Sequence, residues 1–323
     1  MNGLKRICAL LCTAGLCLAL LAGCGAAAPA PDEGGKLKVV ATIFPYYDFA
    51  RAIGGDRLEL SLLLTPGRES HSYEPTPLDV VSIQEADVFL YNGGEGEYWV
   101  DETRKNMDVG DQLAVRMMDF VDAMEEELAE GMEAEPAHDA TAIDSDEIEY
   151  DEHIWTSPVN AQRLATAICD AFCQADPDGA ELYRKNCADY VAQLQTIDGE
   201  FRDVMADAKR TTMVFGDRFP LLYFCKTYGI AYRAAFQGCS ADTEPSAKTL
   251  AFLIDKVKTE DIPVVYHLEL SSEAICDAIC EATGAKSLLF HACHNLSQAE
   301  FEAGVTYLDL MEANVAALRE GLC

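Results

Sequence analysis

Apolar and polar residues along the first third of the chain alternate between a strand pattern and a helix pattern. Residues 37–43 and 58–64 are short apolar runs, which are typical of buried strands. Between them, residues 45–53 have helical spacing and are followed by two glycines. A helix at 77–85 and a strand at 87–91 continue this order. The alternation predicts a parallel sheet covered by helices on both faces.

The second half of the chain repeats the alternation and predicts a second sheet. Its strands are expected at 211–215, 230–236, 262–267 and 287–290, and its helices at 219–227, 245–258, 272–283 and 306–319. The two halves together predict an α/β protein with two lobes, each built on its own parallel sheet.

The most regular pattern lies between these halves. Apolar residues recur there at steps of four and three over about 30 residues, which predicts one long helix with a continuous apolar seam. Such a helix spans on the order of 45 Å, more than one small domain needs. We therefore expect it to join the two lobes rigidly. The seam consists of Tyr183, Cys187, Tyr190, Leu194, Ile197, Phe201, Val204 and Ala208.

The N-terminal segment has the features of a lipoprotein signal peptide. Lys5 and Arg6 precede an apolar run over 7–20, and Leu-Ala-Gly then precedes Cys24. The run is shorter than the roughly 20 apolar residues that a membrane-spanning helix needs. We therefore expect removal of residues 1–23 and a lipid on Cys24, which would anchor the protein to the extracytoplasmic side of the cell membrane.

The predicted elements divide the rest of the chain into four parts. Residues 24–36 are rich in alanine, proline and glycine and are expected to form a flexible stalk. The first lobe is expected at 37–177, the linking helix at 178–209 and the second lobe at 210–323. The roughly 300 residues that follow the signal peptide are enough for two domains.

The chain is strongly acidic, and one segment carries much of the charge. The formal net charge of −31 excludes nucleic acid as the expected partner, because phosphate binding depends on clustered lysine and arginine. Residues 119–152 contain 15 acidic residues, and no lysine or arginine lies between Arg116 and Arg163. We expect this segment to be a long solvated loop of the first lobe, mostly without fixed structure.

Two of the six histidines lie in loops that proline stiffens. His71 opens the run His-Ser-Tyr-Glu-Pro-Thr-Pro, and His153 lies in Asp-Glu-His-Ile-Trp-Thr-Ser-Pro at 151–158. A preorganised loop loses less entropy when it closes around an ion. We therefore predict that both histidines are metal ligands.

Further candidate ligands follow the predicted strands directly. In open α/β sheets, ligands bind outside the carboxyl ends of the strands, and His71, Asp217, Glu269 and His291 each follow one. His294 lies in the same segment as His291 and is either a ligand or a neighbour of one. For Asp217, a cap of the following helix is the alternative to metal binding. Imidazole and carboxylate ligands suit zinc, and also manganese or iron, whereas calcium prefers oxygen ligands.

The motifs at 71–77 and 151–158 resemble those of the zinc and manganese solute-binding lipoproteins of ABC transporters, cluster A-I or family 9. Residues 228–230 and the segment 304–314 are similar to that family's second lobe, and the acidic segment occupies the place of its usual insertion. The resemblance covers essentially the whole mature chain. It implies two lobes joined by a rigid helix, a metal in the cleft between them, and delivery of that metal to a membrane permease.

The chain departs from this family at the two later ligands. Alignment from Tyr228 places the third ligand at Arg218, and a cation cannot bind a cation. Either Asp217 takes this place after a small shift of the loop, or the position is vacant. The fourth ligand, normally an aspartate, is replaced by the segment 290–294.

A set of three histidines would compensate for these departures. The resemblance implies His71, His153 and one of His291 or His294 as ligands, with Glu269 as a nearby acid that modulates the site. Three imidazoles favour Zn²⁺ over Mn²⁺.

We therefore expect a zinc-binding, extracytoplasmic component of an ABC import system, acting as a monomer with a membrane permease. A manganese- or iron-binding protein of the same class is the alternative. A secreted zinc hydrolase is less favoured, because the chain has no His-Glu-x-x-His motif and no recognisable nucleophile elbow. We thus expect no enzymatic activity. A surface adhesin is a further alternative and would bind a host ligand without metal.

Overall fold

The computed structural model describes residues 35–68, 73–105, 107–132, 149–238 and 245–323. The predicted signal peptide, Cys24 and almost all of the stalk lie outside the described residues, and so does His71. Among the helices of the described part, none combines the length and apolar character required to cross a membrane.

The first lobe is built on a sheet of four parallel strands in the order β2-β1-β3-β4. The strands are β1 (Leu37–Ala41), β2 (Leu58–Leu62), β3 (Val88–Tyr91) and β4 (Leu113–Arg116). The helices of this lobe are α2 (Phe44–Gly54), α3 (Pro77–Glu85), α4 (Tyr98–Arg104) and α5 (Pro158–Ala175).

The second lobe has the same architecture, with four parallel strands in the order β6-β5-β7-β8. The strands are β5 (Thr212–Phe215), β6 (Ala231–Ala234), β7 (Val264–His267) and β8 (Lys286–Leu289). Its helices are α7 (Leu222–Tyr228), α8 (Ala247–Thr259), α9 (Ala274–Thr283), α10 (Gln298–Ala303) and α11 (Tyr307–Leu322). The prediction of two parallel α/β sheets is confirmed.

Three short elements were not predicted: α4, β4 and α10. They contain seven, four and six residues, respectively. In β4 only Val115 is buried, and α10 has no buried residue. Segments this short and this exposed have too few apolar positions to reveal a period.

Side chains along the inner strands alternate between two hydrophobic clusters. In β1, Val39 and Ala41 pack into a cluster that also contains Phe49 of α2, whereas Val40 packs into another with Ile83 of α3. Successive strand residues point to opposite faces, so both faces of the sheet are covered. This explains why the strands are apolar runs rather than alternating sequences.

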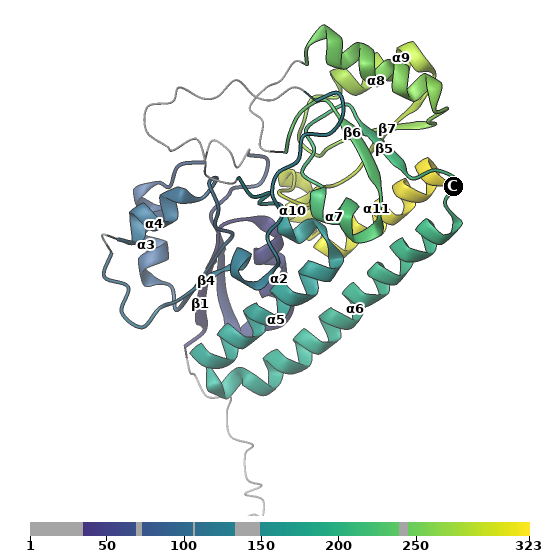
Figure 1. Cartoon of the computed structure of the whole chain (residues 1–323). Coiled ribbons are helices and arrows are strands. Elements are labelled where there is room, and N and C mark those ends of the chain that lie inside the picture. The colour runs from purple at the N-terminus through teal and green to yellow at the C-terminus, as the bar shows by residue number, and fades with distance from the viewer. Residues whose placement is uncertain (1–34, 69–72, 106, 133–148, 239–244) are drawn as a thin grey trace, which may run out of the picture. The chain divides into compact units, whose positions relative to one another are not determined.

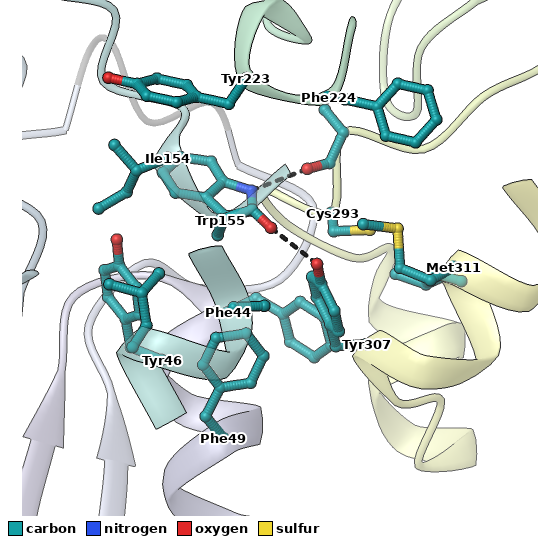
Figure 2. Close-up of a cluster of buried hydrophobic side chains, with 14 of the residues drawn as sticks. Phe44, Tyr46, Phe49, Ile154, Trp155, Tyr223, Phe224, Cys293, Tyr307 and Met311 are labelled. Carbon is teal, nitrogen blue, oxygen red and sulfur yellow. Dashed lines mark hydrogen bonds between the residues drawn. The ribbon is translucent and has the colours of Figure 1, made fainter. Parts of the chain in front are cut away.

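The inner faces of both sheets contribute to one hydrophobic cluster, here called the shared core. It includes Val39 of β1, Met213 of β5 and Trp155, which lies between the lobes. The Tyr307 hydroxyl donates to the Trp155 carbonyl oxygen at 2.7 Å, and the Tyr307 and Phe49 rings lie 4.9 Å apart (Figure 2). The two lobes are therefore joined by packed aromatic side chains as well as by the chain itself.

The predicted long helix is α6 (Ala180–Asp207), with 28 residues. It runs beside α5 (Figure 1), and its buried residues include seven of the eight predicted seam positions. Tyr190 contacts Phe49 of the first lobe, and Phe201 contacts Phe224 of the second, with ring centroids 5.7 and 4.9 Å apart. The helix thus packs against both lobes, as predicted.

The flanks of the acidic segment are more ordered than predicted. Glu125 and Tyr150 form an antiparallel bridge, and the segment before it begins with the 3-10 helix η2 (Met117–Phe120). Carboxylates of these flanks also form ion pairs with the second lobe. The expectation that most of the segment lacks fixed structure stays a prediction. Residues 133–148 lie outside the described residues. The ion pairs are Glu127–Lys226 and Glu130–Arg233.

Both predicted histidine loops lead into helices with well-defined starts. Thr76 caps α3 in a capping box with Asp79, and Pro77 occupies the first turn. Ser157 caps α5, again with a proline in the first turn. Since proline and a capping side chain fix the first helical turn, each loop has a rigid end close to its histidine.

Candidate metal centre

His153 is buried and held in one orientation. Its side chain has 2% exposure, and its Nδ1 lies 3.3 Å from Oδ1 of Asp151. The backbone N–H of His153 donates to the same oxygen at 2.8 Å. A carboxylate accepts hydrogen bonds, so this pair favours the tautomer with hydrogen on Nδ1 and leaves Nε2 with a lone pair. As a metal ligand, His153 would therefore use Nε2.

Asp151 also affects the charge of the His153 ring. Burial by itself lowers the pKa of His153. The charge and hydrogen bond of Asp151, together with the charges of Glu152 and Glu126, outweigh burial, so the pKa is raised. Metal-bound histidines commonly donate their second ring N–H to a carboxylate, and this hydrogen bond increases the basicity of the ligand.

His294 lies next to His153. The centroids of the two rings are 5.8 Å apart, and the Trp155 ring lies 4.9 Å from His294. Glu269 holds the segment that carries His294, because its carboxylate accepts the N–H groups of Ala292 at 2.7 Å and His294 at 3.1 Å. Burial raises the pKa of Glu269 to about 7, although these two donors oppose the shift. Glu269 therefore positions the His294 loop.

His291 has a different environment from His294. The side chain of Asn314 forms two hydrogen bonds with the backbone of His291. It accepts the His291 N–H at 2.7 Å and donates to the His291 carbonyl oxygen at 2.8 Å. The residue is 7% exposed, and burial lowers the pKa of its imidazole. Its Nδ1 has no hydrogen-bond partner within the described residues. The structure thus brings His294, and not His291, to the ring of His153.

The carboxylate of Asp217 is engaged with backbone and hydroxyl donors. It accepts the N–H of Leu268 at 3.0 Å and of Arg218 at 2.7 Å, and the hydroxyl of Ser271 also donates to it. The next helix, α7, has Leu221 at its N-cap, so Asp217 caps the 268–271 loop rather than a helix. The metal-binding role predicted for Asp217 stays a prediction.

A cavity of about 500 Å³, a volume that includes solvent at its mouth, lies where these loops meet. We call it the inter-lobe cavity. Loops of both lobes line it, and its polar lining residues include Arg68, His153, Arg218, Glu269, His294 and Asn295. Neither Asp217 nor His291 is among its lining residues.

A second cavity of about 490 Å³ adjoins the first. His153 and His294 line both cavities, and the second is also lined by Glu97 and Glu152. Burial raises the pKa of Glu97 to about 7 and also raises the pKa of Glu152. The two imidazoles therefore lie at the boundary between a cavity that contains arginines and one that contains carboxyl groups.

The described residues alone do not complete a metal site. Within the ranges that the structure describes, no group of three or more His, Cys, Asp or Glu side chains is arranged to hold an ion. His153 and His294 supply two imidazoles, whereas zinc in proteins usually has four ligands. His71 lies outside the described residues, but Arg68 lines the first cavity and Tyr73 lines the second.

Two polar residues of the inter-lobe cavity were not among those predicted from the sequence. Arg68 lies three residues before His71, and Asn295 directly follows His294. Neither residue type ligates zinc, so a search for ligand types could not select them. Their proximity in sequence to two histidines was the available signal.

Comparison with known proteins gives the same result as the motifs. The family model described as zinc-uptake complex component A, periplasmic, matches residues 39–321. The high-affinity zinc uptake system protein ZnuA of Bacillus subtilis (strain 168) is 33% identical over 314 residues, which cover 95% of each chain.

Solved structures agree with the sequence comparison. The metal-dependent lipoprotein YcdH from Bacillus subtilis has a TM-score of 0.75 and 33% identity, covering 89% of this chain and 100% of that chain. The Zn(II)-bound ZnuA-like domain of Streptococcus pneumoniae AdcA has a TM-score of 0.72 and 30% identity, covering 89% of this chain and 99% of that domain. The chain therefore belongs to the family of zinc-uptake complex component A.

Proposed function

We propose that this protein captures zinc outside the cytoplasm, between its two lobes, and delivers it to the membrane permease of an ABC import system. The observation that carries the proposal is the pair of neighbouring imidazoles, His153 and His294, in a cavity lined by both lobes. The family and the zinc-uptake relative support zinc as the cargo.

The proposed ligands are His71, His153 and His294. His153 offers Nε2, because its Nδ1 faces Asp151. We leave out His291 and Asp217, since neither lines the inter-lobe cavity. Glu269 has the role of a positioning residue, because its carboxylate accepts two backbone N–H groups of the His294 loop. Three imidazoles favour zinc over manganese and iron, which more often include carboxylate ligands.

The N-terminal segment fits this location. We propose that residues 1–23 are a signal peptide, that Cys24 carries a lipid, and that 24–36 form a stalk between the membrane and the two lobes. The proposed lobes are 37–177 and 210–323, with 178–209 as the linking helix. We propose that the protein acts as a monomer, since both lobes of one chain line the cavity.

A binding role is favoured over an enzymatic one. The family is a component of an uptake complex, and the sequence has no His-Glu-x-x-His motif. A zinc hydrolase needs an open coordination position and a base beside it. Glu269, the carboxylate that lines the inter-lobe cavity, is instead hydrogen-bonded to the backbone of the His294 loop.

The proposal is tested by zinc stoichiometry and affinity of the mature protein. We expect one tightly held zinc per chain, measured by elemental analysis and by competition with a chelator. His71→Ala, His153→Ala and His294→Ala should each weaken binding strongly, because each removes a direct ligand.

His291→Ala is the matched control, because it removes an imidazole from the same loop. We expect its zinc affinity to remain close to that of the unaltered protein. Equal losses in His291→Ala and His294→Ala would contradict the ligand assignment, and absence of a tightly bound zinc in the unaltered protein would contradict the function. Manganese and iron are compared in the same competition assay.

A further inference from the structure

Three cysteines come together where α5 packs against α6, and the two helices run side by side (Figure 1). Cys169 and Cys173 belong to α5, and Cys187 belongs to α6. The Sγ of Cys187 donates to the carbonyl oxygen of Ala165 on α5 at 3.7 Å. The Sγ of Cys173 donates to the carbonyl oxygen of Ala180, the first residue of α6, also at 3.7 Å. Both thiols therefore face the opposite helix.

Cys169 lies between the other two thiols. Its thiol forms hydrogen bonds with the thiols of both Cys173 and Cys187. Cys169 is 4% exposed and Cys187 is 7% exposed, whereas Cys173 is half-buried. Cys169 thus has two neighbours as candidate disulfide partners, one on its own helix and one on α6.

Helix geometry selects between these two partners. A disulfide needs its two Cβ atoms about 3.5–4.5 Å apart. Cys169 and Cys173 are four residues apart on one helix, where the Cβ atoms of such neighbours are about 5–6 Å apart. Their bond would therefore distort α5.

Cys187 on α6 is not subject to this fixed spacing. The axes of packed helices are about 8–10 Å apart, and each Cα lies about 2.3 Å from its axis, so facing Cα atoms approach to about 5 Å. This distance is within the range of about 4.4–6.8 Å that disulfides have. The geometry therefore favours a bond between the two helices.

We propose that Cys169 and Cys187 form a disulfide that links α5 to α6, while Cys173 remains a thiol. The oxidant is a small-molecule disulfide, R–S–S–R, outside the cytoplasm. One cysteine thiolate attacks it and releases R–SH, and the other cysteine attacks the resulting mixed disulfide and releases the second R–SH. One R–S–S–R and two cysteine thiols thus give one cross-link and two R–SH, and the two protons of the cysteines pass to the released thiols.

The bond forms while the two helices are still packing together. Burial raises the pKa of both Cys169 and Cys187, so the reactive thiolate becomes scarce in the folded protein. Disulfides form and persist outside the cytoplasm, and the matching family is described as periplasmic. This inference rests on the extracytoplasmic location in the proposed function and is independent of zinc binding.

The cross-link would connect two helices with different tasks. α5 begins at Pro158, directly after the segment that carries His153, and α6 packs against both lobes. The disulfide would hold these two helices in one register along their length.

The test maps the thiols of the mature protein after refolding in a buffer of reduced and oxidised glutathione. Free thiols are blocked with N-ethylmaleimide in denaturant, and the protein is cleaved with trypsin and with a protease that cuts before aspartate. Cleavage after Lys185 separates Cys187 from α5. Cleavage before Asp170 separates Cys169 from Cys173. Mass spectrometry should then find the Cys169 and Cys187 peptides linked and the Cys173 peptide alkylated.

Cys276 and Cys280 are an internal control in the same digest. They lie four residues apart on α9, and their thiols are hydrogen-bonded to each other, as those of Cys169 and Cys173 are. Because the same helix spacing keeps their Cβ atoms too far apart, we expect both to be alkylated.

Thermal stability gives a second measurement. We expect the oxidised protein to melt about 5 °C above the reduced protein, because the cross-link restricts the unfolded chain. Cys169→Ala and Cys187→Ala should each abolish this difference. Cys173→Ala is the matched control, because it removes a thiol of the same cluster and should keep the full difference.

The outcomes separate this inference from the proposed function. Alkylation of both Cys169 and Cys187 at a high ratio of oxidised to reduced glutathione would overturn the inference. A bond between Cys169 and Cys173, or glutathione retained on Cys169 or Cys187 in place of the cross-link, would also overturn it. Zinc stoichiometry is measured on the same samples. A cross-linked protein without tightly bound zinc would overturn the proposed function and support the inference.

Discussion

The side chain of Asn295 is hydrogen-bonded to the backbone of Arg68 across the two lobes. Its Nδ2 donates to the Arg68 carbonyl oxygen at 2.8 Å and also to that of Thr65 at 3.0 Å. A backbone hydrogen bond from Gly67 to Leu296, 2.6 Å long, lies beside them. The loop that leads toward His71 is therefore fixed to the loop that carries His294.

Asn295→Ala should weaken both stability and zinc binding. Two backbone oxygens lose a partly buried donor, which costs about 1–3 kcal/mol of unfolding free energy. The loops before and after the cavity also lose their mutual attachment, so zinc affinity should fall. Chemical denaturation and chelator competition measure the two effects.

Asn186→Ala is a suitable control for Asn295→Ala. Asn186 donates to the carbonyl oxygen of Ile53 at 2.9 Å, away from the cavity. We expect a loss of stability but unchanged zinc affinity. If both variants changed zinc affinity equally, the attachment of the two loops would have no specific role in binding.

Asp151→Asn should reduce zinc affinity by about 10–100-fold, the usual effect of losing a carboxylate behind a metal-bound histidine. Asparagine keeps an oxygen for the His153 backbone N–H, so the loop should stay folded. Asp122→Asn is the control, because Asp122 lies in the same acidic segment with a side chain 95% exposed. Equal affinity in Asp151→Asn and the unaltered protein would exclude this role of Asp151.

Trp155 should report zinc binding by its fluorescence. Its ring centroid lies 5.5 Å from that of His153 and 4.9 Å from that of His294, so a charge on these rings changes its environment. The chain has two tryptophans. We expect emission to change until one equivalent of zinc is added, and Trp99→Phe should preserve this change while Trp155→Phe abolishes it. A signal that depends on Trp99 would contradict the prediction.

Glu97 should make the metal-free protein less stable as the pH rises. Burial raises its pKa from 4.5 to about 7, and the charge of Glu152 adds to the shift. Between these two pH values the folded protein holds a proton that the unfolded chain has lost, so the free energy of unfolding falls with rising pH. Each pKa unit corresponds to roughly 1 kcal/mol, and partial exposure of Glu97 reduces the effect.

Glu97→Gln tests this pH dependence. Glutamine keeps an oxygen for the Gly93 N–H, which donates to Glu97 at 2.9 Å, but it does not titrate. Urea denaturation at about pH 5 and about pH 8 should show a smaller loss of stability in this variant. Glu102→Gln, at an exposed position of α4, the helix that follows Glu97 directly, should behave like the unaltered protein. An unchanged pH dependence in Glu97→Gln would contradict the assignment.

The long-range fold was predictable because burial leaves a clear sequence pattern, a regular period in α6 and apolar runs in the strands. The seam from Tyr183 to Val204 in α6 and the apolar strands such as β1 depend on burial, which the sequence records directly. The ordered flanks of the acidic segment were not predictable in the same way. These flanks contact the second lobe through ion pairs such as that of Glu127 with Lys226, which lie 99 residues apart in the chain. A local sequence pattern cannot predict such a pair.

The metal ligands stay predictions, and the sequence alone does not select among the candidate residues. His291 and His294 differ by three positions, and sequence alone left the choice between them open. In the structure Asn314 holds the backbone of His291, whereas Glu269 holds that of His294, whose ring lies beside His153. The choice of His294 as ligand stays a prediction. Asp217 was a reasonable candidate by its place after β5, but the 268–271 loop supplies donors that occupy its carboxylate.

The shared core limits how an ion can leave. Separating the lobes would expose Trp155, Tyr307 and Phe49 to water, and the free-energy cost would be about 2–3 kcal/mol for each side chain. The contacts of α6 with one of the lobes would also be lost. Wide opening on a hinge is thus a costly route. The cheaper route is rearrangement of the few loops around the histidines, so a transporter needs to disturb those loops and not the body of the protein.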